Sequence, residues 1–236
     1  MVDARALLTI ALAQSALRTI ALAQSAPVLT YFAIAGRGEL ARLYAVVGGL
    51  DIVDSLDTQG YKQKTPIGYL PALAHPEGGL FPACEFAFGC LQESLAVERY
   101  LRELAPGFAN LTAPQRAVDD MVAMIKEDVL ALVEPGAANA SLAPAAVPPA
   151  FDRYLGVLER GYVPDDGFVN GLAHPTGADL AVLVMLRSGF PFGEAIANAG
   201  YDGASAYPKT YALADRAAAF PAVAEYLATS QTFYAV

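Results

Sequence analysis

The chain has 236 residues, with 15 basic against 24 acidic side chains and a formal net charge of −9. Because it holds no basic run, we exclude nucleic-acid binding that neutralises phosphates, and an anionic membrane surface would repel the chain. The hydrophobic fraction is 55%, but the main candidate for a membrane span, residues 6–17, is broken by Thr9, Gln14 and Ser15, and a span needs about 20 apolar residues. We expect no membrane span, and either one large core or two small ones.

The N-terminus carries a tandem repeat, since residues 7–16 read LLTIALAQSA and residues 17–26 read LRTIALAQSA. A shift of ten residues turns a helix by about 280°, so the two copies do not share a face and do not indicate a solenoid or a coiled coil. Three interpretations stay open: a frayed or disordered duplication, a helix that docks on the body or on a partner, and a targeting segment, for which Asp3 is unusual. We seek the function after Ala26.

The first elements after the repeat indicate a βαβ unit. Residues 28–32 (VLTYF) are β-branched and aromatic, which predicts a strand. A glycine-bearing turn at 35–38 follows, and apolar residues at helical spacing then predict a helix over 40–47 that ends at Gly48-Gly49. Residues 52–56 predict a second strand. This order favours two parallel strands joined by a crossover helix.

The next segments predict a hairpin and then helices alone. Residues 68–74 and 80–81 are expected to form two short strands around a turn at 75–79, followed by a helix over 94–104. A domain boundary is expected near 105–113, where the pattern becomes helical. The expected helices are a long one with Val118, Met121, Val122 and Ile125 on one face and, after a Pro/Ala-rich loop at 134–149, helices at 151–161, 179–187, 208–219 and 221–230.

Cysteine and histidine are scarce in this chain. Cys84 and Cys90 are too few for a disulfide scaffold or a structural zinc site, and we expect free thiols rather than a redox pair. With His75 and His174 as the only histidines, we expect no metal-dependent or histidine-based catalysis.

Four short motifs in a fixed order resemble the cytosolic glutathione transferases. They are LTYF at 29–32, GRGE at 36–39, a loop that ends in YLP at 69–71, and ESLAV at 93–97 opening a helix. The sequence looks most like the sigma class, which includes the glutathione-dependent prostaglandin D synthases and the lens S-crystallins. The resemblance runs from about Pro27 to the end of the chain.

Two later motifs support this resemblance. The residues TGADL at 176–180, shortly after Asn170-Gly171, resemble the family's N-capping box, in which Thr176 and Asp179 satisfy each other's backbone N–H groups. The segment FPAV at 220–223 resembles the start of the family's last helix.

The resemblance implies a glutathione transferase fold. This is a thioredoxin-like βαβ-ββα N-terminal domain at 27–105 followed by a helical-bundle C-terminal domain at 113–236, with residues 1–26 as a duplicated extension. It also implies a cytoplasmic homodimer that activates the glutathione thiol for conjugation to, or isomerisation of, a hydrophobic electrophile.

The chemistry of thiol activation shows why the resemblance assigns catalysis to Tyr31. A free thiol has a pKa of roughly 8.5, and lowering it by two units needs about 2.7 kcal/mol. One hydrogen bond to a charged group is worth about 1.5–3 kcal/mol, so a single phenol donor could supply most of this. The motif places Tyr31 at the end of the first strand, where the family has that phenol.

The resemblance also implies a glutathione-binding set. It assigns Glu93 and Ser94, at a helix N-terminus, to the γ-glutamyl end, and Arg37 and Lys62 to the glycine end. Leu70, before an expected cis-proline at Pro71, would pair its backbone with the cysteinyl part.

Glu127 matches the family's acidic position that reaches the glutathione ammonium of the neighbouring subunit. The alternative is that Asp119, Glu127 and Asp128 form a solvated helix face. No metal is implied.

Several residues depart from the family pattern. The chain has no tryptophan, so Tyr61 takes the place of the family's loop tryptophan or the contact is lost. Tyr69 stands at a polar position and Ala35 at a frequent arginine. Residues 81–92 form an extra stretch that adjoins the γ-glutamyl site and could modify or block it.

Two other functions stay open. One is a non-catalytic binding or structural protein on the same fold, as in the crystallins. The other is a thiol oxidoreductase acting through Cys84 or Cys90, which is disfavoured because Tyr31 occupies the expected nucleophile region.

Overall fold

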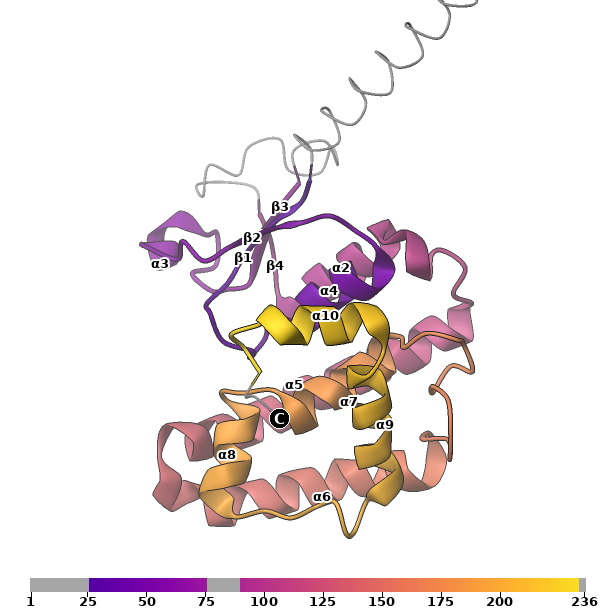
Figure 1. The fold of residues 1–236 in the computed structure, drawn as a ribbon. Helices are drawn as coiled ribbons and strands as arrows, with labels where there is room; N and C mark the ends of the chain where they lie inside the picture. Colours follow the sequence, from indigo (N-terminus) through magenta and orange to yellow (C-terminus); the bar gives the residue numbers. More distant parts are fainter. Residues whose placement is uncertain (1–25, 76–89, 234–236) are drawn as a thin grey trace, which may run out of the picture.

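The computed structural model describes residues 26–75 and 90–233. The N-terminal repeat up to residue 25, the predicted strand at 80–81 and Cys84 lie outside the described residues. Within them, a four-stranded mixed sheet and its helices are followed by a larger set of helices (Figure 1).

The predicted βαβ unit is confirmed. Strand β1 (Val28–Thr30) runs parallel to β2 (Val53–Ser55), and α2 (Glu39–Gly48) connects them. Helix α2 ends at Gly49, which has φ 65° and donates its backbone N–H to Ala45. A glycine is needed there because this left-handed conformation is strained for other residues.

The rest of the sheet differs from the predicted hairpin. Strand β3 (Ala72–Ala74) lies antiparallel to β1, and its other partner is β4 (Leu91–Gln92), so the strand order is β2-β1-β3-β4. The prediction that residues 81–92 form an extra stretch is wrong for residues 91–92, because these form a strand of the sheet. A two-residue strand is too short for its spacing to reveal it. Helix α4 (Ser94–Leu104) follows as predicted, and a short helix α3 (Tyr61–Lys64) was not predicted.

Helices make up the second half of the described chain, and Figure 1 shows them below the sheet. Short 3₁₀ turns η2 (Pro106–Phe108) and η3 (Ala140–Leu142) lie between longer helices. The longer helices are α5 (Ala113–Ala138), α6 (Ala143–Gly161), α7 (Gly177–Arg187), α8 (Phe192–Ala199), α9 (Pro208–Ala218) and α10 (Pro221–Thr229).

The predicted Pro/Ala-rich loop at 134–149 is wrong, because α5 and α6 extend through it. Pro144 lies in the first turn of α6, where its missing N–H has no helical acceptor to lose. Pro148 and Pro149 lie further inside α6, whose residues Val147 and Phe151 are fully buried. Burial of this face and the helix propensity of the alanines outweigh the proline penalty.

Helix α8 was also missed. It follows Gly189, Phe190 and Pro191 and contains Gly193, a composition that locally indicates a loop. The structure buries Phe192 and Ala195 completely in the core, and this tertiary packing stabilises the short helix.

Helix α7 is the centre of the helical half. Its residues from Gly177 to Leu186 are all buried, and the predicted capping box of Thr176 and Asp179 is confirmed. No helix in the described part of the chain is long and apolar enough to cross a membrane.

Candidate functional site

The register of the sheet brings three of the predicted site residues to one edge. Thr30 of β1 pairs with Ala72 of β3, and Ala72 pairs with Gln92 of β4. Tyr31 follows Thr30, Pro71 precedes Ala72, and Glu93 follows Gln92. Since antiparallel neighbours alternate direction, these three residues leave the sheet at the same edge.

Tyr31 is closely packed against the glycine-bearing turn that follows it; we call this packing its cradle. Its side chain is buried, and its hydroxyl accepts a hydrogen bond of 2.9 Å from the backbone N–H of Arg37. A Cβ atom built on Gly36 would overlap the Tyr31 hydroxyl, and one built on Gly38 would overlap its ring. The guanidinium of Arg42 lies over the ring, 5.7 Å from its centroid.

The environment keeps the Tyr31 phenol protonated. Burial raises the pKa of Tyr31, and the N–H of Arg37 and its positive charge oppose this increase only in part. Because the hydroxyl oxygen already accepts from Arg37, its own hydrogen remains for donation to an acceptor at the sheet edge.

The loop before β3 is fixed by a side chain of β4. The Leu70–Pro71 peptide bond is cis, as expected from the sequence. Gln92 accepts from the backbone N–H of Ile67 at 3.0 Å and donates from Nε2 to the carbonyl of Tyr69 at 2.6 Å. Gln92 therefore positions the backbone that leads to Leu70, a role that the sequence did not suggest.

Glu93 has an unusual backbone conformation. Among the described residues it is the non-glycine residue with positive φ, at 69°, and it is the N-cap of the 11-residue helix α4. Such a conformation costs of order 1–3 kcal/mol and persists where the surroundings enforce it, often at functional sites. Ser94, the first residue of α4, is buried beside it.

Arg37 joins Tyr31 to the helical half. Its Nε lies 3.1 Å from Oε2 of Glu127, and its Nη1 lies 3.6 Å from Oε2 of Glu134, both on α5. Tyr31, Arg37 and Glu127 thus come together within one chain.

Lys62 lies on a different element, the short helix α3. It is exposed on α3, with Nζ 6.0 Å from the centroid of the Tyr61 ring. Tyr61 in turn packs edge-to-face on Phe32, which packs on Tyr31. The structure therefore connects Lys62 to the site through a row of aromatic rings.

The supposed solvated face of α5 is wrong for Asp119. This carboxylate is fully buried, and its Oδ1 accepts from Asn170 Nδ2 at 2.9 Å, Thr176 Oγ1 at 2.8 Å and the N–H of Ala178 at 2.9 Å. Glu127 is partly buried in its ion pairs, and Asp128 is exposed.

No protein-family model matches the sequence, and a search of curated proteins gives no match. Solved structures do match. A glutathione S-transferase from Ascaris lumbricoides is 24% identical over 87% of this chain and 97% of its own, with a TM-score of 0.68. Monomeric Na-GST-3, a glutathione S-transferase from Necator americanus, is 23% identical over 86% of this chain and 97% of its own, with a TM-score of 0.65. Prostaglandin synthase D of Nilaparvata lugens is 18% identical over 87% of this chain and 98% of its own, with a TM-score of 0.64.

The chain has the fold of the glutathione transferases. The expected thioredoxin-like sheet followed by a helical bundle is therefore confirmed.

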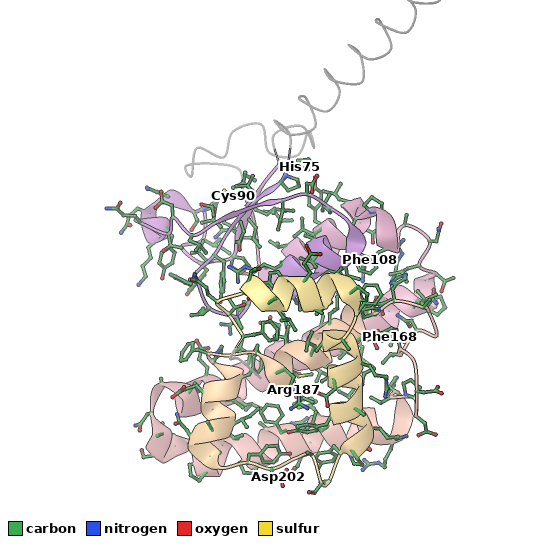
Figure 2. The ribbon with its side chains drawn as sticks, viewed as in Figure 1. His75, Cys90, Phe108, Phe168, Arg187 and Asp202 are labelled. Carbon is green, nitrogen blue, oxygen red and sulfur yellow. The ribbon has the colours of Figure 1, made fainter. Side chains whose placement is uncertain are left out.

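Within this glutathione transferase fold, Cys90 lies at the far end of the sheet from Tyr31. Cys90 precedes β4 and His75 follows β3, and Figure 2 shows both at the end of the sheet that points away from α5 to α9. His75 Nδ1 lies 2.6 Å from the hydroxyl of Tyr100. Cys90 is disulfide-bonded, so the expectation of a free thiol is wrong at this residue.

Sequence reasoning missed a buried charged pair close to Arg37. Lys126 of α5 is fully buried, with Nζ 2.5 Å from Oε1 of Glu98 on α4 and 2.9 Å from Oε1 of Glu127. Burial raises the pKa of Glu98 to about 7, against the opposing charge of Lys126. The only signal in the sequence was a charged residue at an apolar helix position, which becomes informative once both helices are placed. In the two described ranges, no three His, Cys, Asp or Glu residues gather in a way that could hold a metal ion.

Proposed function

We propose that this protein is a glutathione transferase, close to the sigma class, that lowers the pKa of the glutathione thiol for attack on a hydrophobic electrophile. The observation that carries the proposal is the Tyr31 hydroxyl, which is buried, stays protonated and accepts from the backbone N–H of Arg37, so that its own hydrogen is what it can offer to a ligand. A thiolate is such an acceptor, and a charge-assisted hydrogen bond stabilises it relative to the thiol.

The residues around Tyr31 suit a peptide-like thiol. In the proposal, the backbone of Leu70 before Pro71 pairs with the cysteinyl part. Glu93 and Ser94, at the N-terminus of α4, take the γ-glutamyl end, where N–H groups and the helix dipole favour a carboxylate. Arg37 and Lys62 serve the glycine end.

The proposed reaction forms a carbon–sulfur bond to the electrophile. The thiol proton leaves to solvent, and the electrophile either expels a leaving group or takes up a proton. An isomerisation that starts with the same thiolate is the related possibility, and the similar fold of a protein named prostaglandin synthase D supports including it.

We also propose a homodimer in which Glu127 faces the partner's glutathione. Two large apolar side chains of α5, Met124 and Leu132, are about half exposed at 51% and 46% and could be covered by a second copy. A glutathione S-transferase of similar fold is described as monomeric, so sedimentation equilibrium of the purified protein decides between the two states.

The test of the catalytic role is Tyr31→Phe. This change removes one hydrogen bond to the thiolate and keeps the ring in its cradle. We expect glutathione to bind with a similar dissociation constant while the pKa of the bound thiol rises by about 1–2 units and conjugation of a model electrophile slows about 3- to 25-fold at neutral pH. Thiolate absorbance of the binary complex measures the pKa.

Tyr100→Phe is the matched control. It also removes one tyrosine hydroxyl, but that hydroxyl lies beside His75, at the end of the sheet away from Tyr31. It should conjugate as fast as the wild type. Conjugation at the wild-type rate by Tyr31→Phe would remove Tyr31 from the mechanism.

A non-catalytic protein on the same fold is the second candidate. The observation that favours it is Tyr69, whose side chain is 70% exposed at a loop position where the family has a polar residue. Calorimetric titration with glutathione separates the two candidates, because the absence of binding at millimolar ligand would end the enzyme proposal.

A further inference from the structure

Lys126 has no part in the roles proposed above, although it is a fully buried charge close to them. Its side chain is 0% exposed and that of its partner Glu98 is 2% exposed. Burying two ions carries a large desolvation cost, and replacing such a pair with apolar residues is often neutral or stabilising. Stability alone therefore gives no reason for charges at this point between α4 and α5.

The pair continues as a chain of contacts that ends at Tyr31. Lys126 Nζ lies 2.9 Å from Oε1 of Glu127, and the other oxygen of that carboxylate accepts from Arg37 Nε at 3.1 Å. The backbone N–H of Arg37 donates to the Tyr31 hydroxyl at 2.9 Å. This series of contacts thus links α4, α5 and the loop before α2.

The charges along this series of contacts change the pKa of the Tyr31 hydroxyl in opposite directions. Burial raises the pKa of Tyr31 most; the charges of Arg37 and Lys126 lower it, and that of Glu127 raises it. The Arg42 guanidinium is a further positive charge beside the tyrosine, 5.7 Å from the centroid of its ring. Without Lys126, the negative charge of Glu127 would be balanced only by Arg37, and an anion beside the phenol would be less stable.

We propose that Lys126 is a positioning residue of the thiol site: it holds Glu127 against Arg37 and balances its charge, so that an anion is stabilised next to the Tyr31 hydroxyl. This inference rests on the proposed function for the identity of that anion, a glutathione thiolate. The carboxylates of Glu98 and Glu127 both raise the pKa of Lys126 and so keep it charged while buried.

The test removes the pair without leaving one buried charge alone. In the double variant Glu98→Leu/Lys126→Met, we expect glutathione to bind within about twofold of the wild type while the pKa of the bound thiol rises by roughly 0.5–1 unit. At a pH well below the pKa of the bound thiol, where the thiolate fraction changes tenfold per unit of pKa, kcat/KM should then fall about three- to tenfold. Thiolate absorbance without electrophile gives the pKa independently of turnover.

The matched control is Arg102→Met/Asp120→Leu. This pair joins the same two helices at 2.7 Å, and the Arg102 side chain is 5% exposed. The ion-pair partners of Arg102 and Asp120 are each other, Glu103 and Arg99, which lie outside the series of contacts to Tyr31. The control should leave the pKa of the bound thiol unchanged. A shift below about 0.2 units in the folded Glu98→Leu/Lys126→Met protein, or an equal shift in the control, would overturn the inference.

A second measurement works without glutathione. The amide resonance of Arg37 reports its hydrogen bond to Tyr31, and we expect it to shift in Glu98→Leu/Lys126→Met but not in the control. If the wild type binds no glutathione, the proposed function fails, yet a shifted Arg37 amide still supports the contact chain and an unshifted one overturns it. Should the apolar pair not fold, the neutral pair Glu98→Gln/Lys126→Gln undergoes the same measurements.

Discussion

At the scale of single residues, the site depends on small side chains as much as on reactive ones. Gly36 and Gly38 both face Tyr31, and neither has room for a Cβ atom. Gly36 also has φ 42°, whereas Gly38 has φ −93° and ψ −20°, which any residue adopts. At Gly38 the requirement for glycine is therefore one of space alone.

Gly38→Ala tests this requirement. The added methyl group would displace the Tyr31 ring, and we expect the free energy of unfolding to fall by about 1–3 kcal/mol, as in other overpacked sites. Conjugation should slow about tenfold or more, because the hydroxyl moves from its position. Urea unfolding and a steady-state assay measure the two effects.

Gly49→Ala provides the comparison for this variant. Gly49 has a φ of 65°, a backbone conformation that is strained for alanine, but nothing lies within 4 Å of the Cβ atom that alanine would add. We expect a loss of about 1 kcal/mol with unchanged conjugation. Full activity in Gly38→Ala would show that the cradle does not orient Tyr31.

At the scale of elements, the central helix α7 is stabilised at its N-terminus from another helix. Asp119 of α5 binds the N–H of Ala178 and the side chains of Thr176 and Asn170, more than fifty residues along the chain. The capping box within α7 was visible in the sequence, but this additional acceptor was not. An acidic residue on a long helix gives no local sign of being buried.

Asp119→Ala should therefore destabilise the protein strongly. The change removes the acceptor of three hydrogen bonds, two of them from buried donors. We expect a loss of about 3–5 kcal/mol in the free energy of unfolding. The matched variant is Asp128→Ala on the exposed face of α5, where the loss should stay near about 0.5 kcal/mol. Similar losses in the two variants, measured by urea unfolding, would contradict the role of Asp119.

At the scale of the whole molecule, the sheet and the helical half are joined by charged and polar contacts. Glu98 on α4 meets Lys126 on α5, Arg37 meets Glu127, and the hydroxyl of Tyr226 on α10 donates to Glu39 on α2 at 2.6 Å. The candidate site lies where the first two of these contacts meet, so that both halves contribute to it.

The burial of Glu98 gives the molecule a pH-dependent stability. Burial raises the pKa of Glu98 to about 7, above the ordinary glutamate value expected after unfolding. Folded Glu98 then binds a proton that the unfolded chain releases, so its stabilising contribution is complete below the unfolded pKa and is lost as the pH rises to about 7.

Glu98→Gln should remove this dependence. Between about pH 5 and pH 7, the free energy of unfolding of the wild type should fall with rising pH more steeply than that of Glu98→Gln, by up to about 1.4 kcal/mol per pH unit. Urea unfolding of both proteins across this range measures the slopes. Parallel slopes would mean that Glu98 stays ionised throughout.

The sequence by itself determined the motif order and the part of the local structure that depends on neighbouring residues. Hydrophobic spacing predicted the βαβ unit and α4, and the glycines and caps predicted the ends of α2 and the start of α7, because each of these depends on residues within one or two turns. The motif around Tyr31 and the cis bond at Pro71 were likewise recognisable from short segments.

Only the tertiary structure decided how these pieces form a site. The register of Thr30, Ala72 and Gln92 brings Tyr31, Pro71 and Glu93 to one edge, and contacts across 90 and 28 residues connect Arg37 to Glu127 and Lys126 to Glu98. Such contacts depend on how elements pack, and burial can override local preference, as it does for the prolines of α6. A charged side chain has its pKa and its role set by those distant neighbours, and no local spacing encodes them.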